Sequence, residues 1–207
     1  MDGDIAPLPD IVRIAHKYKA MVMVDEAHGT GVFGKKGRGV VEHFNLSKKV
    51  DIVMGTLSKA VGSLGGYVSG DTDLINYLRN KARPFMYTTA LPPAVCAASI
   101  AGIKLIRKDP SLRESLWCNV RFLKEKLESL SLKVIPSESP IIPILIGDAK
   151  KAVDVSKFLY KKGILIPAIR PPTVPARSSR LRMTVMSTHT KKDLERLLEV
   201  LSDVQDL

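Results

Sequence analysis

The chain has 207 residues, a formal net charge of +11, a hydrophobic fraction of 45% and a charged fraction of 26%. These values predict a globular protein with one large or two small domains. No apolar run reaches the length of a membrane span and the first residues lack a signal peptide, so we expect a cytoplasmic protein with no membrane association. Cys96 and Cys118 are too few for a disulfide framework or a zinc site, and we expect no metal.

The basic charge leaves several interpretations open. It suits a polyanionic partner, phosphate-rich small molecules, or simply a lysine-rich proteome. No basic helix stripe with interleaved aromatic residues is evident, so we expect no nucleic-acid partner. The lysines are instead spread along the chain as pairs: Lys35-Lys36, Lys48-Lys49, Lys150-Lys151, Lys161-Lys162 and Lys191-Lys192.

The first half of the chain reads as alternating helices and buried strands. Apolar spacing predicts an amphipathic helix over residues 7–18, and a continuous apolar run predicts a strand over 20–24, buried on both faces of a parallel sheet. A glycine-rich loop follows. The remaining expected elements are strands at 50–54 and 65–69, a helix at 71–81, an extended segment at 85–90 and a long helix from 92 to 107.

The pattern changes after Lys108, where we place a domain division. The second half predicts a small α+β unit with helices over a sheet. Its expected elements are helices at 111–130, 148–162 and 191–204, and strands at 134–135, 141–146, 164–169 and 181–186.

Lys59 is the residue of greatest chemical interest, because it lies in a turn of small residues between two short apolar strands. Burying a lysine cation is costly, whereas a desolvated amine has a lowered pKa and can form a Schiff base. A surface-turn lysine is the equally open alternative.

Asp25 and His28 follow the strand at 20–24, at the end where open α/β sheets bind ligands. The alternative is an aspartate that caps a turn and a histidine that bonds the backbone. The segment Val-Asp-Glu-Ala-His also matches the Walker B signature of DEAH-type helicases. The phosphate-binding loop that such a motor needs is absent from this sequence.

Hydroxyl pairs and arginines supply further candidates. Thr56 and Ser58 precede Lys59 and suit a phosphate, although ordinary turn chemistry explains them equally well, as it does Thr88 and Thr89. Arg180 and Arg182 share one face of a predicted strand, where an arginine fork suits a carboxylate. The alternative is a pair of solvated arginines on an edge strand.

Four motifs in order resemble the α-oxoamine synthases, a family of fold-type I pyridoxal-phosphate enzymes, over nearly the whole chain. They are Met-Asp-Gly-Asp-Ile-Ala-Pro-Leu-Pro, Val-Asp-Glu-Ala-His-Gly-Thr-Gly, Tyr-Thr-Thr-Ala-Leu-Pro-Pro and Ala-Ile-Arg-Pro-Pro-Thr-Val-Pro. The last is most like the biotin-pathway member. The resemblance implies an α/β fold: residues 1–108 form part of the large, mostly parallel-sheet domain, and residues 109–207 form the small α+β carboxyl-terminal domain.

The resemblance also implies the cofactor, pyridoxal 5′-phosphate, and the residues that hold it. Lys59 resembles the lysine that bonds the cofactor and later moves protons at the substrate α-carbon. Asp25 resembles the partner of the ring nitrogen, and His28 the partner of the ring's 3′ oxygen. Thr56 resembles a phosphate ligand, and Thr89 one supplied across the interface of a homodimer.

Arg182 resembles the arginine that holds the amino-acid carboxylate, and Thr173 a contact to the acyl donor. The implied reaction is the decarboxylative condensation of L-alanine with a pimeloyl thioester, carried by coenzyme A or an acyl carrier protein. Condensation of glycine with an acetyl thioester (glycine C-acetyltransferase) and a non-catalytic remnant that only dimerises are the alternatives.

Two features depart from the family pattern. Arg177 stands where family members usually have a glycine, which serves a special backbone angle or a close approach. The chain also begins inside the large domain, so we expect a carboxyl-terminal fragment or a truncated gene product. We expect such a chain alone to bind the cofactor weakly and to show negligible activity.

Overall fold

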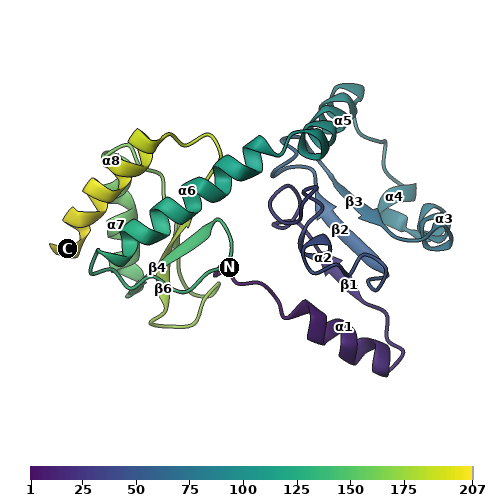
Figure 1. Cartoon of the computed structure of the whole chain (residues 1–207), viewed down its shortest axis with the longest axis horizontal. Helices are drawn as coiled ribbons and strands as arrows, with labels where there is room; N and C mark the ends of the chain where they lie inside the picture. The colour runs from purple at the N-terminus through teal and green to yellow at the C-terminus, as the bar shows by residue number, and fades with distance from the viewer. Residues whose placement is uncertain (207) are drawn as a thin grey trace. The chain divides into compact units, whose positions relative to one another are not determined.

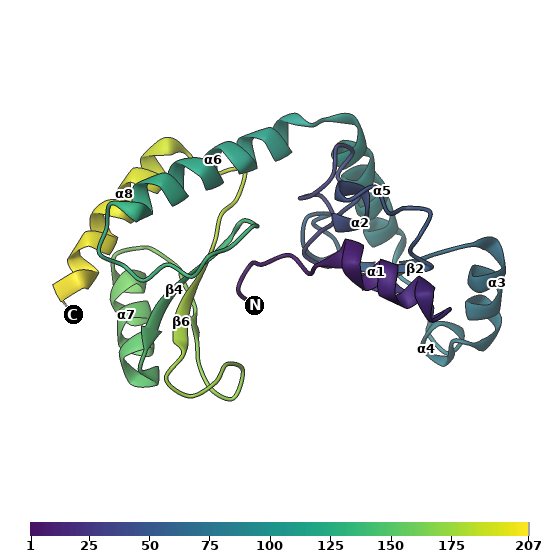
Figure 2. The same cartoon turned by 60° about the horizontal axis from the view of Figure 1, so that its bottom comes forward.

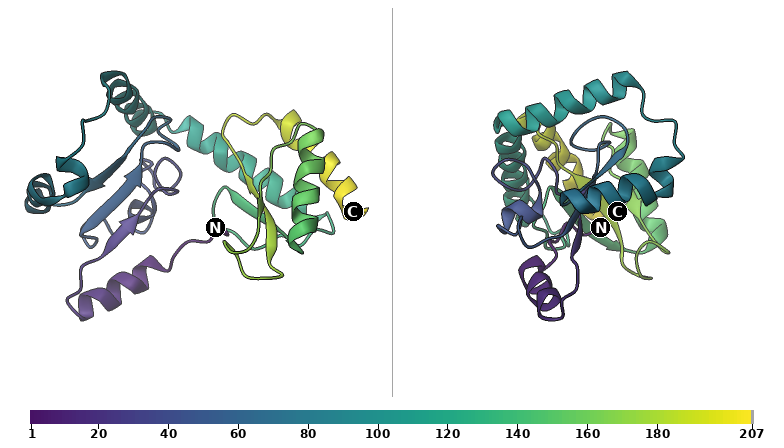
Figure 3. Two further views of the ribbon diagram at one scale, coloured as in Figure 1. Left: turned by 180° about the vertical axis from the view of Figure 1, so that it is seen from behind. Right: turned by 90° about the vertical axis from the view of Figure 1, so that its right-hand side faces the viewer.

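The computed structural model describes residues 1–206, and these form two compact units. Ala6–Ser111 make up what we call the amino-terminal unit. The carboxyl-terminal unit comprises Met1–Ile5 together with the chain from Leu112 onward. The sequence places residues 1–5 in the first domain, whereas the structure packs them with the second, which is visible in Figure 3 as the purple N-terminal stretch.

The amino-terminal unit is built around a three-stranded sheet in the order β1-β2-β3 (Figure 1). β1 pairs with β2 in parallel, and β3 pairs with β2 in antiparallel fashion. The strands are Met23–Asp25, Ile52–Thr56 and Gly66–Ser69, and the helices are α1 (Leu8–Lys17), α2 (Val40–His43), α3 (Thr72–Lys81), α4 (Arg83–Met86) and α5 (Pro93–Lys108).

Only one face of this sheet is covered within the unit. Val24 and Val53 pack against a buried cluster contributed by α1, α2 and the segments beside them: Leu8, Val12, Val22, Val41 and Leu46. On the opposite face Met23 is 56% exposed and Val68 is 43% exposed. The expectation of strands buried on both faces is therefore wrong for this chain.

The segment after α3 differs from the extended conformation expected for residues 85–90. Phe85 and Met86 belong to α4, the one-turn helix Arg83–Met86. Pro84 lies in its first turn, where the missing N–H of proline costs nothing and its fixed φ favours a helix. α3 does begin as expected, because the Asp71 carboxylate caps the helix by accepting from the Leu74 N–H at 2.7 Å.

The carboxyl-terminal unit has an antiparallel sheet in the order β4-β6-β5, with helices α6, α7 and α8 gathered around it (Figures 1 and 2). Its elements are α6 (Ser111–Glu128), β4 (Ile141–Gly147), α7 (Ala149–Lys161), β5 (Ala168–Ile169), β6 (Ser179–Thr184), α8 (Lys191–Ser202) and the 3-10 helix η1 (Asp203–Asp206). The strand expected at 134–135 is reduced to an isolated bridge between Val134 and Ile144. Because β6 is the central strand, the edge-strand interpretation of its arginines is wrong.

The core of this unit is made by leucines and β-branched residues at helical or alternating spacing. Leu123 and Leu127 of α6, Ile142 of β4, Leu159 of α7 and Leu201 of α8 are at most 1% exposed. The start of α8 is secured by a capping box in which Thr190 and Asp193 exchange hydrogen bonds. This hydrogen bonding from Thr190 lowers the pKa of the exposed Asp193 carboxyl.

The loop between β5 and β6 holds the residue that departs from the family pattern. Arg177 has a φ of 61°, in the left-handed region that glycine adopts without cost. The arginine therefore keeps the backbone conformation that a glycine would serve, and it does so under strain of about 1–2 kcal/mol.

We predict that Arg177→Gly stabilises the protein by up to about 1 kcal/mol, because relief of the strain exceeds the extra chain entropy of glycine in the unfolded state. Chemical denaturation measures the difference. Ala176→Gly is the matched control, since its φ is not positive and only the entropy cost of about 0.4–1 kcal/mol remains. A destabilised Arg177→Gly would contradict the strain.

Candidate active site

Two polar side chains lie at the same edge and on the same face of the β1-β2-β3 sheet. Asp25 ends β1, Thr56 ends β2, and the two strands are parallel, so both ends meet at one edge. Asp25 is paired with Met54 in the register, and Thr56 lies two residues further, which places all three on one face. This is the face that α1 and α2 leave uncovered, and it confirms the expected position of Asp25 at a strand end.

The turn after β2 presents Lys59 and is closed by its own backbone. The Lys59 carbonyl accepts from the Gly62 N–H at 2.9 Å, and the Leu57 carbonyl accepts from the Ser63 N–H at 2.7 Å. The Leu57 N–H in turn donates to the Gly65 carbonyl at 2.8 Å. The turn thus has a defined shape, while the Lys59 side chain is exposed in this chain. Of the two alternatives left open by the sequence, the exposed side chain in this chain matches the surface-turn lysine.

Helix α5 fixes the same turn from one side. The Ser63 hydroxyl donates to the Val95 carbonyl at 3.0 Å and accepts from the Ser99 hydroxyl at 2.8 Å. A Cβ on Gly102 would lie 3.1 Å from Val61 Cγ1, so the helix approaches the turn closely. These contacts hold the backbone around Lys59 to a rigid element.

The loop after β1, which contains His28, reaches the Lys59 turn. A Cβ on Gly31 would lie 2.6 Å from the Cβ of Ala60, the residue after the lysine. In addition, the hydroxyls of Thr30 and Tyr67 are 2.7 Å apart, which ties the loop to β3. The exposed His28 thus belongs to a loop that packs beside the lysine turn.

Glu26 organises that loop, and the sequence reading assigned it no role. Its side chain is 1% exposed, and its carboxylate accepts from the Val40 N–H at 2.9 Å and the Val41 N–H at 2.7 Å. These are the first amides of α2. A Cβ on either Gly29 or Gly39 would overlap the carboxylate. In the sequence, the only sign of this role was that Gly29 and Gly39 follow a carboxylate at a strand end.

Burial raises the pKa of the Glu26 carboxyl above its ordinary value, because desolvation penalises the charged form. The hydrogen bonds from Val41 and Val40 act in the opposite direction, and the nearby charge of Asp25 adds to the rise. The strand end thus holds two carboxyls in different environments. Glu26 is buried and bonded to two helix amides, whereas Asp25 is exposed and caps a turn by accepting from the Ala27 N–H at 2.8 Å.

Thr56 and Ser58 form a hydroxyl pair next to the lysine. Their Oγ atoms are 2.6 Å apart, and the Ser58 N–H also donates to Thr56 Oγ1 at 3.2 Å. The groups at this edge fit the pyridoxal phosphate that the resemblance implies: a carboxylate for a ring nitrogen, an amine for a carbonyl carbon, and hydroxyls for a phosphate.

The other expected site residues lie outside this constellation. Thr89 is exposed in the segment before α5, two residues before Leu91, whose side chain lies beside Gly65 of the lysine turn. Thr173 and Arg182 belong to the carboxyl-terminal unit. Thr173 is exposed in the turn after Arg170, and Arg182 lies partly buried on β6 opposite Pro143. The roles expected for all three stay predictions.

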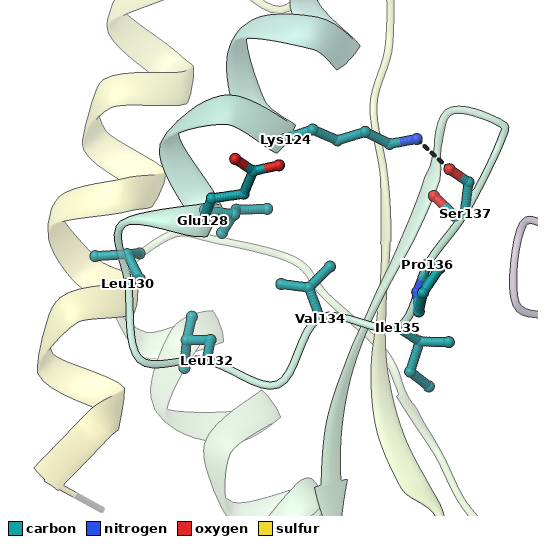
Figure 4. A pocket seen from close by; sticks show the side chains of 9 residues that line it. Lys124, Glu128, Leu130, Leu132, Val134, Ile135, Pro136 and Ser137 are labelled. Atoms are coloured by element: carbon teal, nitrogen blue, oxygen red, sulfur yellow. Dashed lines mark hydrogen bonds between the residues drawn. The ribbon is translucent and has the colours of Figure 1, made fainter.

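A hollow of about 480 Å³ in the carboxyl-terminal unit contains none of the expected site residues (Figure 4). It lies between α6 and the segment that follows it. Lys124 on its rim donates to the Ser137 carbonyl at 2.5 Å, and burial lowers the pKa of this amine.

Among the described residues no cluster of side chains suits a metal ion. No helix within the described range is long and apolar enough to cross a membrane.

Comparison with known proteins gives consistent matches along the whole chain. The aminotransferase class I and II family matches residues 1–201. The 8-amino-7-oxononanoate synthase of Thermoanaerobacter pseudethanolicus is 47% identical over 204 residues, which are 99% of this chain and 52% of that protein.

Two solved structures show the same fold. The serine palmitoyltransferase of Sphingomonas wittichii has a TM-score of 0.95 at 35% identity, and covers 100% of this chain with 52% of its own length. The 8-amino-7-oxononanoate synthase of Francisella tularensis has a TM-score of 0.86 at 30% identity, and covers 100% of this chain with 60% of its own length. The chain spans about half the length of the curated relatives that it matches.

We predict that the stability advantage of the wild type over Glu26→Gln shrinks as the pH rises from about 4.5. A raised folded-state pKa means that the folded protein keeps a proton which the unfolded chain has lost, so stability falls through this window. Unfolding free energies measured from about pH 4 to about pH 7 test it. Glu114→Gln, an exposed site in the other unit, is the control for generic charge effects. An advantage that grows with pH would contradict the prediction.

Proposed function

Because the chain belongs to the aminotransferase class I and II family, we propose that it binds pyridoxal phosphate and takes part in 8-amino-7-oxononanoate synthesis. The observation that carries the proposal is the grouping of Asp25, Thr56 and the Lys59 turn at one edge of a parallel strand pair. Identity of 47% to an enzyme of that name supports the reaction class.

Pyridoxal phosphate, when bound, draws electrons from the α-carbon of an amino acid and so makes its proton removable. The Asp25 carboxylate would accept a hydrogen bond from the ring nitrogen and hold the proton there. His28 would contact the ring oxygen. The hydroxyls of Thr56 and Ser58 would donate to the phosphate, in line with their placement beside the lysine.

Lys59 would bond the cofactor's carbonyl carbon through Nζ. The same nitrogen would also take the proton from the substrate α-carbon. Arg182 would hold the substrate carboxylate, and Thr173 would contact the thioester donor. In balance, L-alanine and a pimeloyl thioester give 8-amino-7-oxononanoate, carbon dioxide and the free thiol.

We also propose that the active form is a homodimer, with Thr89 donating to the phosphate held by a second copy. Phe85 and Tyr87, close to Thr89 in the sequence, are 62% and 77% exposed. Aromatic side chains at this exposure suit a surface that another subunit covers. The net charge of +11 suits an acidic or phosphate-bearing acyl donor such as coenzyme A or a carrier protein.

We predict that Lys59→Ala abolishes covalent attachment of pyridoxal phosphate. The purified protein is incubated with the cofactor, reduced with borohydride and dialysed, and the labelled peptide is found by mass mapping. Label is expected on Lys59 in the wild type and in Lys48→Ala, a control that removes another exposed lysine of the same unit. Equal labelling of Lys59→Ala would contradict the assignment.

We predict that Arg182→Lys raises the KM for L-alanine about tenfold or more, because a lysine cannot replace the bidentate carboxylate contact, worth about 1.5–3 kcal/mol. Product formed from L-alanine and pimeloyl-coenzyme A is measured by mass spectrometry, and glycine with acetyl-coenzyme A is the competing pair. Arg121→Lys, an exposed arginine on α6, is the control. Preference for glycine would favour the acetyltransferase alternative.

A further inference from the structure

Met1–Ile5 dock on the carboxyl-terminal unit through their backbone. The Gly3 carbonyl accepts from the Glu138 N–H at 2.8 Å, and the Ile5 N–H donates to the Glu138 carboxylate at 3.4 Å. Gly3 has a φ of 77°, and a Cβ there would lie 2.8 Å from the Ser139 hydroxyl oxygen. The backbone at Gly3 therefore packs so closely against the chain beside β4 that only glycine fits at this position.

Asp2 anchors the same segment by its side chain. Its carboxylate forms an ion pair with Arg180 on β6, whose side chain is 7% exposed. The Arg180 Nε also donates to the Ser178 carbonyl at 3.0 Å. A guanidinium this deeply buried needs a counter-charge. Asp2 supplies it, and the pairing in turn fixes where the peptide between Met1 and Asp2 lies.

The oxygen of that peptide contacts Arg182. The Arg182 Nε donates to the Met1 carbonyl at 3.4 Å, and the described residues offer its guanidinium no other hydrogen-bond partner. Arg180 and Arg182 share a face of β6, so one segment meets both. The bond at Nε restricts how the guanidinium can turn and leaves the two terminal nitrogens for a carboxylate.

We propose that Asp2 is a positioning residue for Arg182. By pairing with Arg180 it holds the Met1 carbonyl at the Nε of Arg182, and so orients the terminal nitrogens toward the carboxylate of an amino-acid substrate. The substrate part rests on the proposed function, whereas the orientation of the guanidinium does not.

The kinetic test is a double-mutant cycle in the active protein. Asp2→Asn is expected to raise the KM for L-alanine about tenfold in the wild-type background and less than twofold in the Arg182→Lys background, because coupled residues are not additive. Asp4→Asn, the same charge change two residues along the segment, is expected to have little effect in either. An equal rise in both backgrounds, or a loss of kcat alone, would overturn the proposal.

A second readout needs no substrate, and its first measurement uses the wild type alone. In the wild type, the Arg182 Nε–H is expected to exchange with solvent more slowly than the Nε–H of the exposed Arg121, measured by arginine side-chain NMR. Asp2→Asn is expected to remove this protection and Asp4→Asn to keep it. Fast exchange in the wild type overturns the positioning role. Slow exchange in the wild type retains the orientation whatever the turnover, whereas pyridoxal phosphate that fails to label Lys59 overturns the proposed function alone.

Discussion

The buried carboxylate of Glu26 is the contact on which the geometry of the candidate site depends. The loop that follows it contains Gly31, Gly34, Gly37 and Gly39, all at positive φ, and ordering glycines costs more chain entropy than ordering other residues. Two short hydrogen bonds from the first amides of α2 to one carboxylate offset part of that cost, since bonds to a charged acceptor are the stronger kind. The two ends of the loop that carries His28 are thereby held together.

Asp25 and Glu26 are adjacent carboxyls with opposite surroundings. The alternation of a strand sends one to the open face of the sheet and the other into the loop. The two negative charges repel each other, and this repulsion adds to the raised pKa of Glu26. The buried member is satisfied by backbone amides of α2. The exposed member accepts from the Ala27 N–H through Oδ1 at 2.8 Å, which leaves Oδ2 for a ligand. Of these two adjacent residues, Glu26 therefore stabilises the loop, whereas Asp25 lies where it can contact a ligand.

The sequence predicted the parts of the fold that local pattern controls. Helices such as α1 and α7 were placed within a residue or two by apolar spacing, and Asp25 was placed at a strand end by the buried run before it. The one-turn helix α4 was missed because Phe85 and the nearby Tyr87, Thr88 and Thr89 read as an extended segment. Arg180, Asp2 and Glu26 gain their meaning from contacts with distant residues or with backbone amides, which no local period encodes. The roles of Lys59 and Arg182 came from the resemblance, because both depend on bound molecules that no local pattern encodes.

Because Met1–Ile5 dock on the carboxyl-terminal unit, that unit is made of two stretches that are separated in the sequence. Arg180 lies on the central strand of its sheet with a side chain that is only 7% exposed, and its charge is paired by a segment that lies far away in sequence. The carboxyl-terminal unit is therefore incomplete without residues that precede the amino-terminal unit. That segment continues directly into α1, which covers the face of the sheet opposite Asp25. The buried ion pair thus ties the start of the chain to the sheet that carries Arg182.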